Sequence, residues 1–464
     1  MQLEQLHHES LGHASYLIAS EQTGDALVVD PRRDVAPYLD LAAREGYRIR
    51  YVVDTHQHND YLSGLRELVE RSGATALGSG HTDRLGYDHE PVKDGHRIEL
   101  GEVGVTVLHT PGHTPEHISF LLTDGQQDDD EPAILLSGGA LLVGDLARPD
   151  LLGSPEQTKA SAESFCATIQ HKLLTLPDHV LVYPTHVAGS LCGGAIGSRL
   201  VTTVGYERRT NEILREVSNK DDFVQQCLRL DNLPAVPPYW PRMRGQNADG
   251  VQPVGTVDLP PPVNVDDVDL DGDVIVLDTR QPEAYASGHI PGALNVGYGS
   301  SFPTWAGTVL PEGARTLVVV DDTEQLEEIT WELLRIGYDR PVGHLRGGMF
   351  AWRTSGRPMD NLPTVTVQDL ADDLDRYHVL DVRQPGEWAS GHAPDAQFIT
   401  GAELPSRIDE VPTDREVLVV CGSGFRSTVA SSLLTHHGRD NITNLLGGMS
   451  AWTAADLPTT TDDD

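Results

Sequence analysis

The second half of this 464-residue chain carries one pattern twice, in copies that lie about 100 residues apart. Three short motifs recur in the same order. They are LDTRQP at 277–282 and LDVRQP at 380–385, ASGH at 286–289 and at 389–392, and GGM followed by AW at 347–352 and at 447–452. The period is too long for a solenoid repeat and has the length of a small domain. We therefore expect two homologous domains in this half.

The first ~240 residues alternate apolar runs of strand length with stretches of helical periodicity, a pattern typical of an α/β domain. The predicted strands are Ala26–Asp30, Ile49–Asp54, Val105–His109, Ile118–Leu122, Ala133–Ser137 and Val180–Tyr183. Helices are predicted over 59–71 and over about 200–217. The Pro-rich segment Leu233–Pro262 has little periodicity, which predicts a linker or a wrapping arm.

The chain is strongly acidic, with 34 Lys and Arg against 70 Asp and Glu and a net charge of −36. Such a charge argues against nucleic-acid binding and against attraction to an anionic membrane, because both require basic patches. It suits a surface solvated in concentrated salt, so we expect a halophilic cytoplasm. There is no apolar run long enough to span a membrane and no secretory signal pattern. Four cysteines predict reduced thiols rather than a disulfide framework.

A candidate metal motif, THQHNDYLSG at 55–64, follows the apolar run 51–53. His56, His58 and Asp60 are spaced two apart, so a strand that runs into a loop would direct them into one cleft. Further candidate ligands follow other apolar runs. They are His113 in the sequence HTPGHTP, Asp145 in the sequence VGD, and His186 in the sequence YPTH. A single histidine beside a turn is usually structural, but this combined spacing predicts a metal site.

These motifs resemble the metallo-β-lactamase fold, an αββα sandwich that carries its metal ligands on loops at strand ends. Its two-metal members, such as glyoxalase II, have a histidine where this chain has Tyr61. Its persulfide dioxygenase branch binds one ferrous iron, and the resemblance assigns the ligands here to His56, His113 and Asp145. The sequence after Asp145, with Arg148-Pro-Asp150, also resembles that branch.

Two His and one carboxylate are the set expected of a non-haem Fe(II) oxygenase. His58, Asp60 and His186 then become residues that orient ligands or water, or the ligands of a second metal. Cys192 lies six residues after His186 in a Gly-rich loop and could hold a persulfide near the metal; simple packing of a turn explains it equally well. The two remaining cysteines outside the last domain, Cys166 and Cys227, are predicted to be core residues.

The last domain contains a second candidate site at Cys421. The apolar run 416–420 leads into Cys421-Gly-Ser-Gly-Phe-Arg426-Ser, followed by a helical stretch. Backbone N–H groups at the start of a helix stabilise a thiolate, and Arg426 adds positive charge for an anion such as sulfite or thiosulfate. The pattern resembles a rhodanese, with Cys421 as the sulfur carrier; the loop of related phosphatases is one residue longer.

The middle domain shares the flanking motifs but has no cysteine in the corresponding loop. Counting back 100 residues from Cys421 reaches Asp321, in the acidic stretch VVVDDTE. This domain resembles a rhodanese that has lost catalysis, and we expect it to act in spacing, docking or dimer contact.

The expected domains are a metallo-β-lactamase-like domain (1–245), a linker (246–265), a rhodanese-like domain without the catalytic cysteine (266–360) and a rhodanese domain (361–464). Their order resembles persulfide dioxygenase–rhodanese fusions. That resemblance implies one Fe(II) per chain, a low-molecular-weight thiol persulfide and O2 as substrates, and sulfite or thiosulfate as sulfur partners. We also expect a homo-oligomer. The alternatives are a binuclear zinc thioester hydrolase with a sulfurtransferase domain and a non-enzymatic sulfide sensor or carrier.

Overall fold

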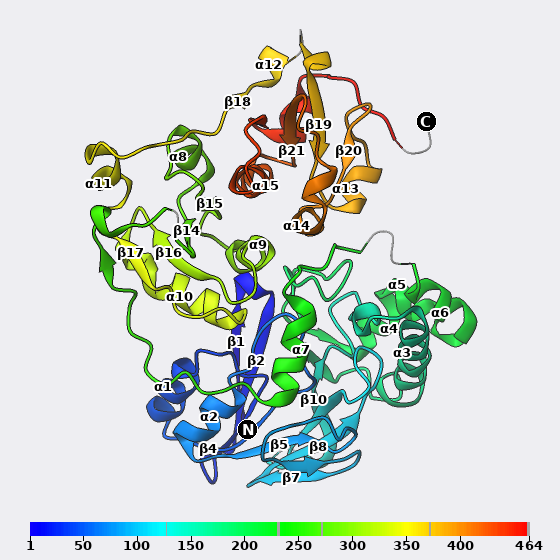
Figure 1. The fold of residues 1–464 in the computed structure, drawn as a ribbon. Helices are drawn as coiled ribbons and strands as arrows, with labels where there is room; N and C mark the ends of the chain where they lie inside the picture. The colour runs from blue at the N-terminus through cyan, green and yellow to red at the C-terminus, as the bar shows by residue number, and fades with distance from the viewer. Residues whose placement is uncertain (127, 230–232, 271, 371–372, 462–464) are drawn as a thin grey trace. The chain divides into compact units, whose positions relative to one another are not determined.

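The computed structural model describes residues 1–126, 128–229, 233–270, 272–370 and 373–461. The chain forms two compact units (Figure 1). The first unit comprises Met1–Leu230 and Trp240–Thr256, and the second comprises Asp231–Tyr239 and Val257–Asp464. Among the described residues, every helix is too short or too polar to cross a bilayer.

The first unit contains two six-stranded sheets. One sheet runs in sequence order through β1 (Gln2–His8), β2 (His13–Ala19), β3 (Asp25–Val29), β4 (Arg48–Val53), β5 (Thr75–Ser79) and β6 (Glu90–Val92). The other has the order β12 (Thr202–Thr203), β11 (Leu181–Pro184), β10 (Asp128–Gly138), β9 (Ile118–Asp124), β8 (Val103–His109) and β7 (Arg97–Leu100). Alternate side chains from both sheets, including Tyr16, Val53, Val105 and Phe120, are fully buried in one shared core.

Helices cover the outer faces of this sheet pair. Helices α1 (Ala36–Glu45) and α2 (Leu65–Ser72) lie on one side, and α3 (Pro155–Thr168), α4 (Val204–Thr210), α5 (Glu212–Arg215) and α6 (Lys220–Cys227) lie on the other (Figure 1). Each side has its own apolar cluster, one around Tyr38 and Leu68 and one around Phe165 and Phe223. This αββα sandwich confirms the predicted fold of the first part.

The second unit contains two parallel five-stranded sheets with the same strand order. The first has β13 (Pro262–Val263), β17 (Gly343–Leu345), β16 (Arg315–Val319), β14 (Val274–Asp278) and β15 (Leu294–Asn295). The second has β18 (Thr364–Val365), β22 (Ile442–Leu445), β21 (Glu416–Val420), β19 (Tyr377–Asp381) and β20 (Gln397–Phe398). The prediction of a duplicated α/β domain is confirmed.

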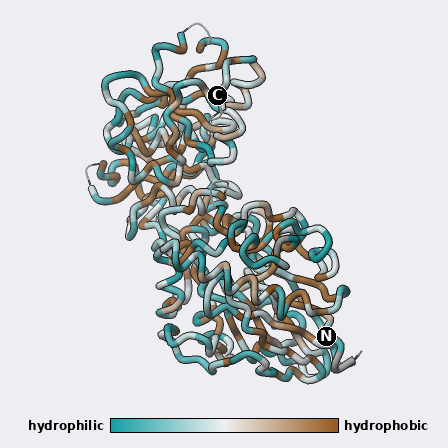
Figure 2. The backbone as a smooth tube through the Cα atoms, turned by 90° about the vertical axis from the view of Figure 1, so that its right-hand side faces the viewer, coloured by the Kyte–Doolittle hydropathy of each residue, from teal (hydrophilic) through white to brown (hydrophobic). Residues whose placement is uncertain are grey.

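The helices of the two sheets correspond in the same way. They are α8 (Pro282–Ser287), α9 (Phe302–Val309), α10 (Leu326–Arg335) and α11 (Gly348–Thr354) around the first sheet, and α12 (Val367–Leu370), α13 (Pro385–Ala389), α14 (Leu404–Arg407), α15 (Phe425–His436) and α16 (Gly448–Ala454) around the second. Figure 2 shows hydrophobic segments in the interior of both units and hydrophilic ones along outer loops.

Three predicted elements differ from the structure. The helix expected over 59–71 begins only at Leu65, because the preceding residues form the loop that carries Asp60 and Tyr61. In place of the single helix expected over 200–217, the chain forms the short strand β12, the helices α4 and α5, and a 3-10 turn. The segment predicted as a linker or a wrapping arm contains α7 (Trp240–Asp249), which belongs to the first unit, so this part is not a linker.

Candidate functional sites

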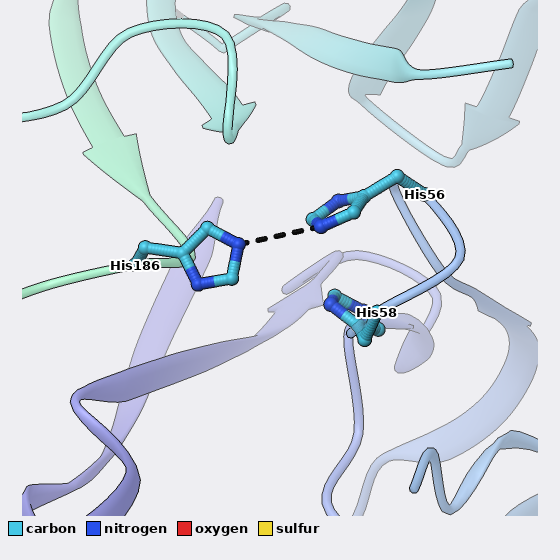
Figure 3. Close-up of side chains that lie close together, drawn as sticks. All are labelled: His56, His58 and His186. Carbon is cyan, nitrogen blue, oxygen red and sulfur yellow. Dashed lines mark hydrogen bonds between the residues drawn. The ribbon is translucent and has the colours of Figure 1, made fainter. Parts of the chain in front are cut away.

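Three histidines from distant loops converge in the first unit (Figure 3). His56 and His58 follow β4, and His186 follows β11, so each lies where a strand of one of the two sheets ends. One ring nitrogen from each of these three residues lies within 4.8 Å of the others. The His56 and His186 Nε2 atoms are 3.3 Å apart. All three side chains are buried. The structure therefore brings together histidines that are 130 residues apart in sequence.

A buried carboxylate orients two of these histidines. Asp30, at the end of β3, accepts hydrogen bonds from the Thr55 amide at 2.6 Å, the Thr55 hydroxyl at 2.9 Å and His58 Nε2 at 3.1 Å, and also from the Thr185 hydroxyl. Because the Thr55 hydroxyl donates to Asp30, its oxygen accepts from His56 Nδ1 at 2.8 Å. This network leaves His56 Nε2 and His58 Nδ1 as the nitrogens free to bind a ligand.

His113 is oriented by a backbone carbonyl. Its Nδ1 donates to the carbonyl oxygen of Arg148 at 2.9 Å, and its Nε2 is buried without a hydrogen-bond partner. The Cys192 sulfur, His113 and His186 also present ligand atoms within 4.8 Å of one another. Burial raises the pKa of the Cys192 thiol. Cys192 thus lies beside the candidate metal ligands, as the sequence suggested.

The donor set fits a metal ion. The Nδ1 atom of His186 lies 3.4 Å from the Asp60 carboxylate, which leaves its Nε2 directed at the His56 Nε2. Two nitrogens bound at about 2.1 Å to one ion at a tetrahedral angle lie about 3.4 Å apart. Two facing lone pairs at such a separation repel each other unless a proton or a metal ion lies between them. Burial lowers the pKa of His186, but Cys192 and Asp60 outweigh it and raise that pKa well above its usual value.

Asp145 is not brought into this cluster. One carboxylate oxygen accepts the Leu146 amide at 2.8 Å, and the other accepts the amides of Gly194 at 2.8 Å and Ala195 at 2.7 Å. Within the part of the chain that the structure describes, no convergent ligand group includes it. Its loop is nevertheless close to the site, because the Arg148 amide donates to the Cys192 carbonyl at 2.7 Å. Of the three ligands predicted for one iron, only His56 and His113 face each other, with ring centroids 4.8 Å apart.

Tyr61 has the place where the two-metal members have a histidine, and it is fully buried. Its hydroxyl donates to the Asp30 carbonyl at 3.4 Å, and its ring packs at 4.4 Å from that of His13. Sequence reasoning missed His13, which is fully buried with neither ring nitrogen hydrogen-bonded. It also missed His117, whose ring stacks on His56 at 5.1 Å. Neither residue lies in a metal-type motif, so nothing in the sequence marked them.

Four buried imidazoles of this site have a lowered pKa, because burial disfavours their charged form. They are His13, His56, His113, for which burial lowers the pKa to about 3, and His117. His58 differs: burial lowers its pKa, but Asp30 outweighs that effect and raises it. His56 and His113 therefore offer neutral imidazole nitrogens, the form that binds metal. His58 and His186, whose pKa values are raised, would have to lose a proton before binding a metal ion.

The second candidate site is the loop between β21 and α15. The Cys421 side chain is 1% exposed, and its sulfur accepts the Gly424 amide at 3.1 Å and lies 3.4 Å from the Ser427 hydroxyl. The turn at Gly447–Met449 packs against this loop. The Met449 amide donates to the Cys421 carbonyl at 2.7 Å, and a Cβ on Gly448 would lie 2.3 Å from that oxygen. Only glycine fits there.

Arg426, predicted to attract an anion, is paired with a carboxylate. Its guanidinium donates two hydrogen bonds to Glu387, at 2.5 Å and 2.7 Å. Burial would raise the pKa of Glu387, but Arg426 holds it below its ordinary value. The Arg426 charge is therefore neutralised in this state, and an anionic substrate must compete with Glu387 for it.

The middle repeat confirms that no thiol takes the place of Cys421, but the counterpart predicted for it is wrong by one residue. Asp381 pairs with Val420, and the equivalent Asp278 pairs with Val319. The residue after each strand is therefore Cys421 in one repeat and Val320 in the other. Counting back 100 residues gave Asp321 because that period holds for the GGM motifs (347 and 447), whereas Val320 lies 27 residues before its GGM motif and Cys421 lies 26 before its own.

Comparisons with known proteins agree with this architecture. Residues 10–186 match the metallo-beta-lactamase superfamily, and residues 266–355 and 366–455 each match a rhodanese-like domain. The crystal structure of a metallo-beta-lactamase from Staphylococcus aureus subsp. aureus COL is 32% identical, with a TM-score of 0.67 over 74% of this chain and 98% of that one. The chain belongs to the metallo-beta-lactamase superfamily, in a fusion with two rhodanese-like domains.

Curated relatives of the fusion's first domain fall into two groups. The mitochondrial persulfide dioxygenase ETHE1 of Bos taurus is 28% identical over 226 residues, which cover 47% of this chain and 77% of the relative. The cytoplasmic hydroxyacylglutathione hydrolase of Arabidopsis thaliana is 32% identical over 175 residues, which cover 37% of this chain and 62% of the relative. Both groups match the same unit, so identity alone does not choose between an oxygenase and a hydrolase.

Proposed function

We propose that the first unit is a non-haem iron persulfide dioxygenase and that Cys421 transfers sulfur to or from its product. The observation that carries the proposal is the Cys192 sulfur among the ligand atoms of His113 and His186, in a chain that also holds a rhodanese-type cysteine. The overall reaction is RSSH + O2 + H2O → RSH + SO3²⁻ + 2H⁺. The setting we propose is the cytoplasm of a salt-adapted cell, with the chain as a homo-oligomer.

We propose that His56, His113 and Asp145 hold the iron, which requires Asp145 to give up backbone amides that it accepts here and to join the histidines. When bound by two imidazoles and a carboxylate, ferrous iron supplies the redox chemistry needed to react with O2. The chain's own residues prepare the site: Thr55 orients His56, and the Arg148 carbonyl orients His113. Burial of the histidines keeps them neutral and excludes bulk water.

Cys192 and Cys421 would act on sulfur. Cys192 would hold or position the outer sulfur of the persulfide beside the ligand histidines. At Cys421, the S–S bond of a cysteine persulfide breaks, its outer sulfur bonds to sulfite to give thiosulfate, and the electron pair returns to the Cys421 sulfur. The Gly424 amide stabilises that thiolate. The reverse transfer uses the same contacts.

The identity of the carboxylate ligand is the sharpest test of the proposed ligand set, because both Asp60 and Asp145 are candidates for it. Asp145→Asn and Asp60→Asn are isosteric, so iron content and persulfide-dependent O2 uptake can be compared directly. We expect Asp145→Asn to lose most bound iron and O2 uptake, and Asp60→Asn to keep measurable amounts of both. The opposite ranking would assign the carboxylate ligand to Asp60 and overturn the ligand set.

A binuclear thioester hydrolase is the second candidate, favoured by the convergence of His58 and His186 beside Asp60. A hydrolase of this kind needs a second metal to activate water. Tyr61, whose hydroxyl donates to the Asp30 carbonyl, weighs against that second site. Two zinc ions per chain together with hydrolysis of a glutathione thioester would favour this candidate over the oxygenase.

A further inference from the structure

A helix from the segment predicted as a linker contacts the loop that bears the candidate ligands. Asn247 on α7 is 7% exposed. Its side-chain amide donates to the His58 carbonyl at 2.9 Å and to the Tyr61 carbonyl at 2.8 Å, and its side-chain oxygen accepts the Ser63 amide at 2.9 Å. One side chain thus bridges three backbone groups that lie more than 180 residues away in sequence.

The orientation of this amide is fixed by its partners. Two carbonyl oxygens can only accept, and the Ser63 amide can only donate, so one placement of the Asn247 oxygen and nitrogen satisfies all three bonds. The two carbonyls enclose the turn that contains Asp60. The His58 ring, at one end of that turn, is held by Asp30. The Asn247 side chain therefore fixes the backbone at both ends of turn 58–61, which directly follows the candidate ligand His56; we call it the ligand turn.

The residues that follow α7 are bound to the same unit by separate hydrogen bonds. Arg66 Nη1 donates to the Gly250 carbonyl at 3.0 Å, and the Glu67 carboxylate accepts the Val254 amide at 2.6 Å. Arg66 and Glu67 both lie on α2, outside the ligand turn. The bond between Arg66 and Gly250 can therefore be removed by mutation without changing the ligand turn, and its removal provides a matched control.

We propose that Asn247 is a positioning residue of the metal centre, through the His58, Tyr61 and Ser63 backbone groups that it bridges. Asn247 bonds to the turn that follows the candidate ligand His56 and not to a ligand side chain itself. Partners that support a metal site from outside its ligand set typically contribute roughly 10–100-fold to metal affinity or activity, and we adopt that range as the expected effect. The inference rests on the proposed metal site, but it is independent of which reaction that site performs.

The test uses the full chain with Asn247→Asp, Asn247→Ala and, as control, Arg66→Ala. Asn247→Asp keeps the shape and the acceptor but loses both donated bonds; Asn247→Ala leaves space in which water can bond to the freed groups. Affinity for Fe(II) and for Co(II) is measured by chelator competition, and the visible spectrum of the Co(II) form reports the ligand arrangement. Thermal unfolding of the metal-free proteins identifies which variants fold.

We expect roughly 10–100-fold weaker metal binding and an altered Co(II) spectrum in the folded Asn247 variants, larger for Asp than for Ala, with Arg66→Ala close to wild type. A folded Asn247 variant that binds metal as tightly as Arg66→Ala, with an unchanged spectrum, would overturn the proposal. If the wild type binds metal but does not oxidise persulfides, the proposed function fails while this inference still stands.

Discussion

Replacing Gly448 with alanine should destabilise the protein and displace the Cys421 loop, because the new methyl group would overlap the backbone of that loop. Gly448 has φ +54, and its new Cβ would lie 2.3 Å from the Cys421 carbonyl and 2.9 Å from the Gly422 carbonyl. The left-handed conformation alone costs roughly 1–2 kcal/mol. Relief of the overlap by moving the backbone adds about 1–3 kcal/mol. The expected total is about 2–5 kcal/mol, together with a displaced Cys421.

Two other glycines separate these contributions. Gly438 has φ +77 and nothing within 4 Å of its would-be Cβ, so Gly438→Ala reports the conformational cost alone. Gly348, the counterpart of Gly448 in the middle repeat, has φ +55 and a nearest contact of 3.1 Å to the Val320 carbonyl. Gly348→Ala should therefore cost an intermediate amount and leave sulfur transfer intact.

The assay combines thermal unfolding with thiosulfate-to-cyanide sulfur transfer. For a unit of this size, each kcal/mol lowers the unfolding temperature by about 2–4 °C. We expect the order Gly438→Ala, Gly348→Ala, Gly448→Ala for increasing destabilisation, and at least about a tenfold loss of transfer only in Gly448→Ala. Equal stability and equal transfer in Gly448→Ala and Gly438→Ala would refute the argument that the Gly448 turn sets the position of Cys421.

Three further outcomes are expected. Cys421→Ser should abolish thiosulfate formation, measured chromatographically, while persulfide-dependent O2 uptake continues; loss of both would mean that the second unit supplies the first. Between pH 6.5 and 5 the metal-free protein should lose stability in urea titrations, because the four imidazoles with a lowered pKa take up protons only on unfolding, by up to about 1.4 kcal/mol per pH unit for each. His58 and His186, with a raised pKa, and Asp54, whose pKa burial raises to about 7, hold protons more tightly in the folded state and offset part of this loss. The four imidazoles outweigh them in the lower half of this range, so constant stability there would contradict the burial argument. Raising KCl from about 0.1 to 1 M should raise the unfolding temperature, since the net charge of −36 is then screened, whereas an unchanged temperature would count against adaptation to salt.

The parts of the site that could be predicted are those written locally in the sequence. His56, His58 and Asp60 share one loop, and Cys421 shares a loop with Arg426, so each local motif indicated a candidate site and its family resemblance implied the chemistry. Residues that act from elsewhere in the fold gave no such signal. Asn247 lies in a Pro-rich segment with little periodicity, and its contacts appear only when that segment folds back onto the ligand turn.

The secondary structure likewise divides into elements that local sequence predicts and elements that depend on distant contacts. In the first unit, β3, β4 and β8 to β11 followed from apolar periodicity, because burial of a strand requires it. The other strands of these two sheets, such as β1, β2 and β5, were not predicted. The start of α2 at Leu65 did not, because it depends on contacts from elsewhere in the fold: the backbone of the residues before Leu65 bonds to Asn247 and to the Pro31 carbonyl. The position equivalent to Cys421 depended on strand register, which is set by pairing with β14 and not by counting residues.

Metal content and oxygen uptake of the same anaerobically purified sample test the central proposal most directly. The account predicts about one iron per chain and consumption of one O2 for each sulfite formed from a thiol persulfide, as the balanced reaction requires. Two zinc ions per chain, with thioester hydrolysis and no oxygen uptake with any persulfide, would contradict it.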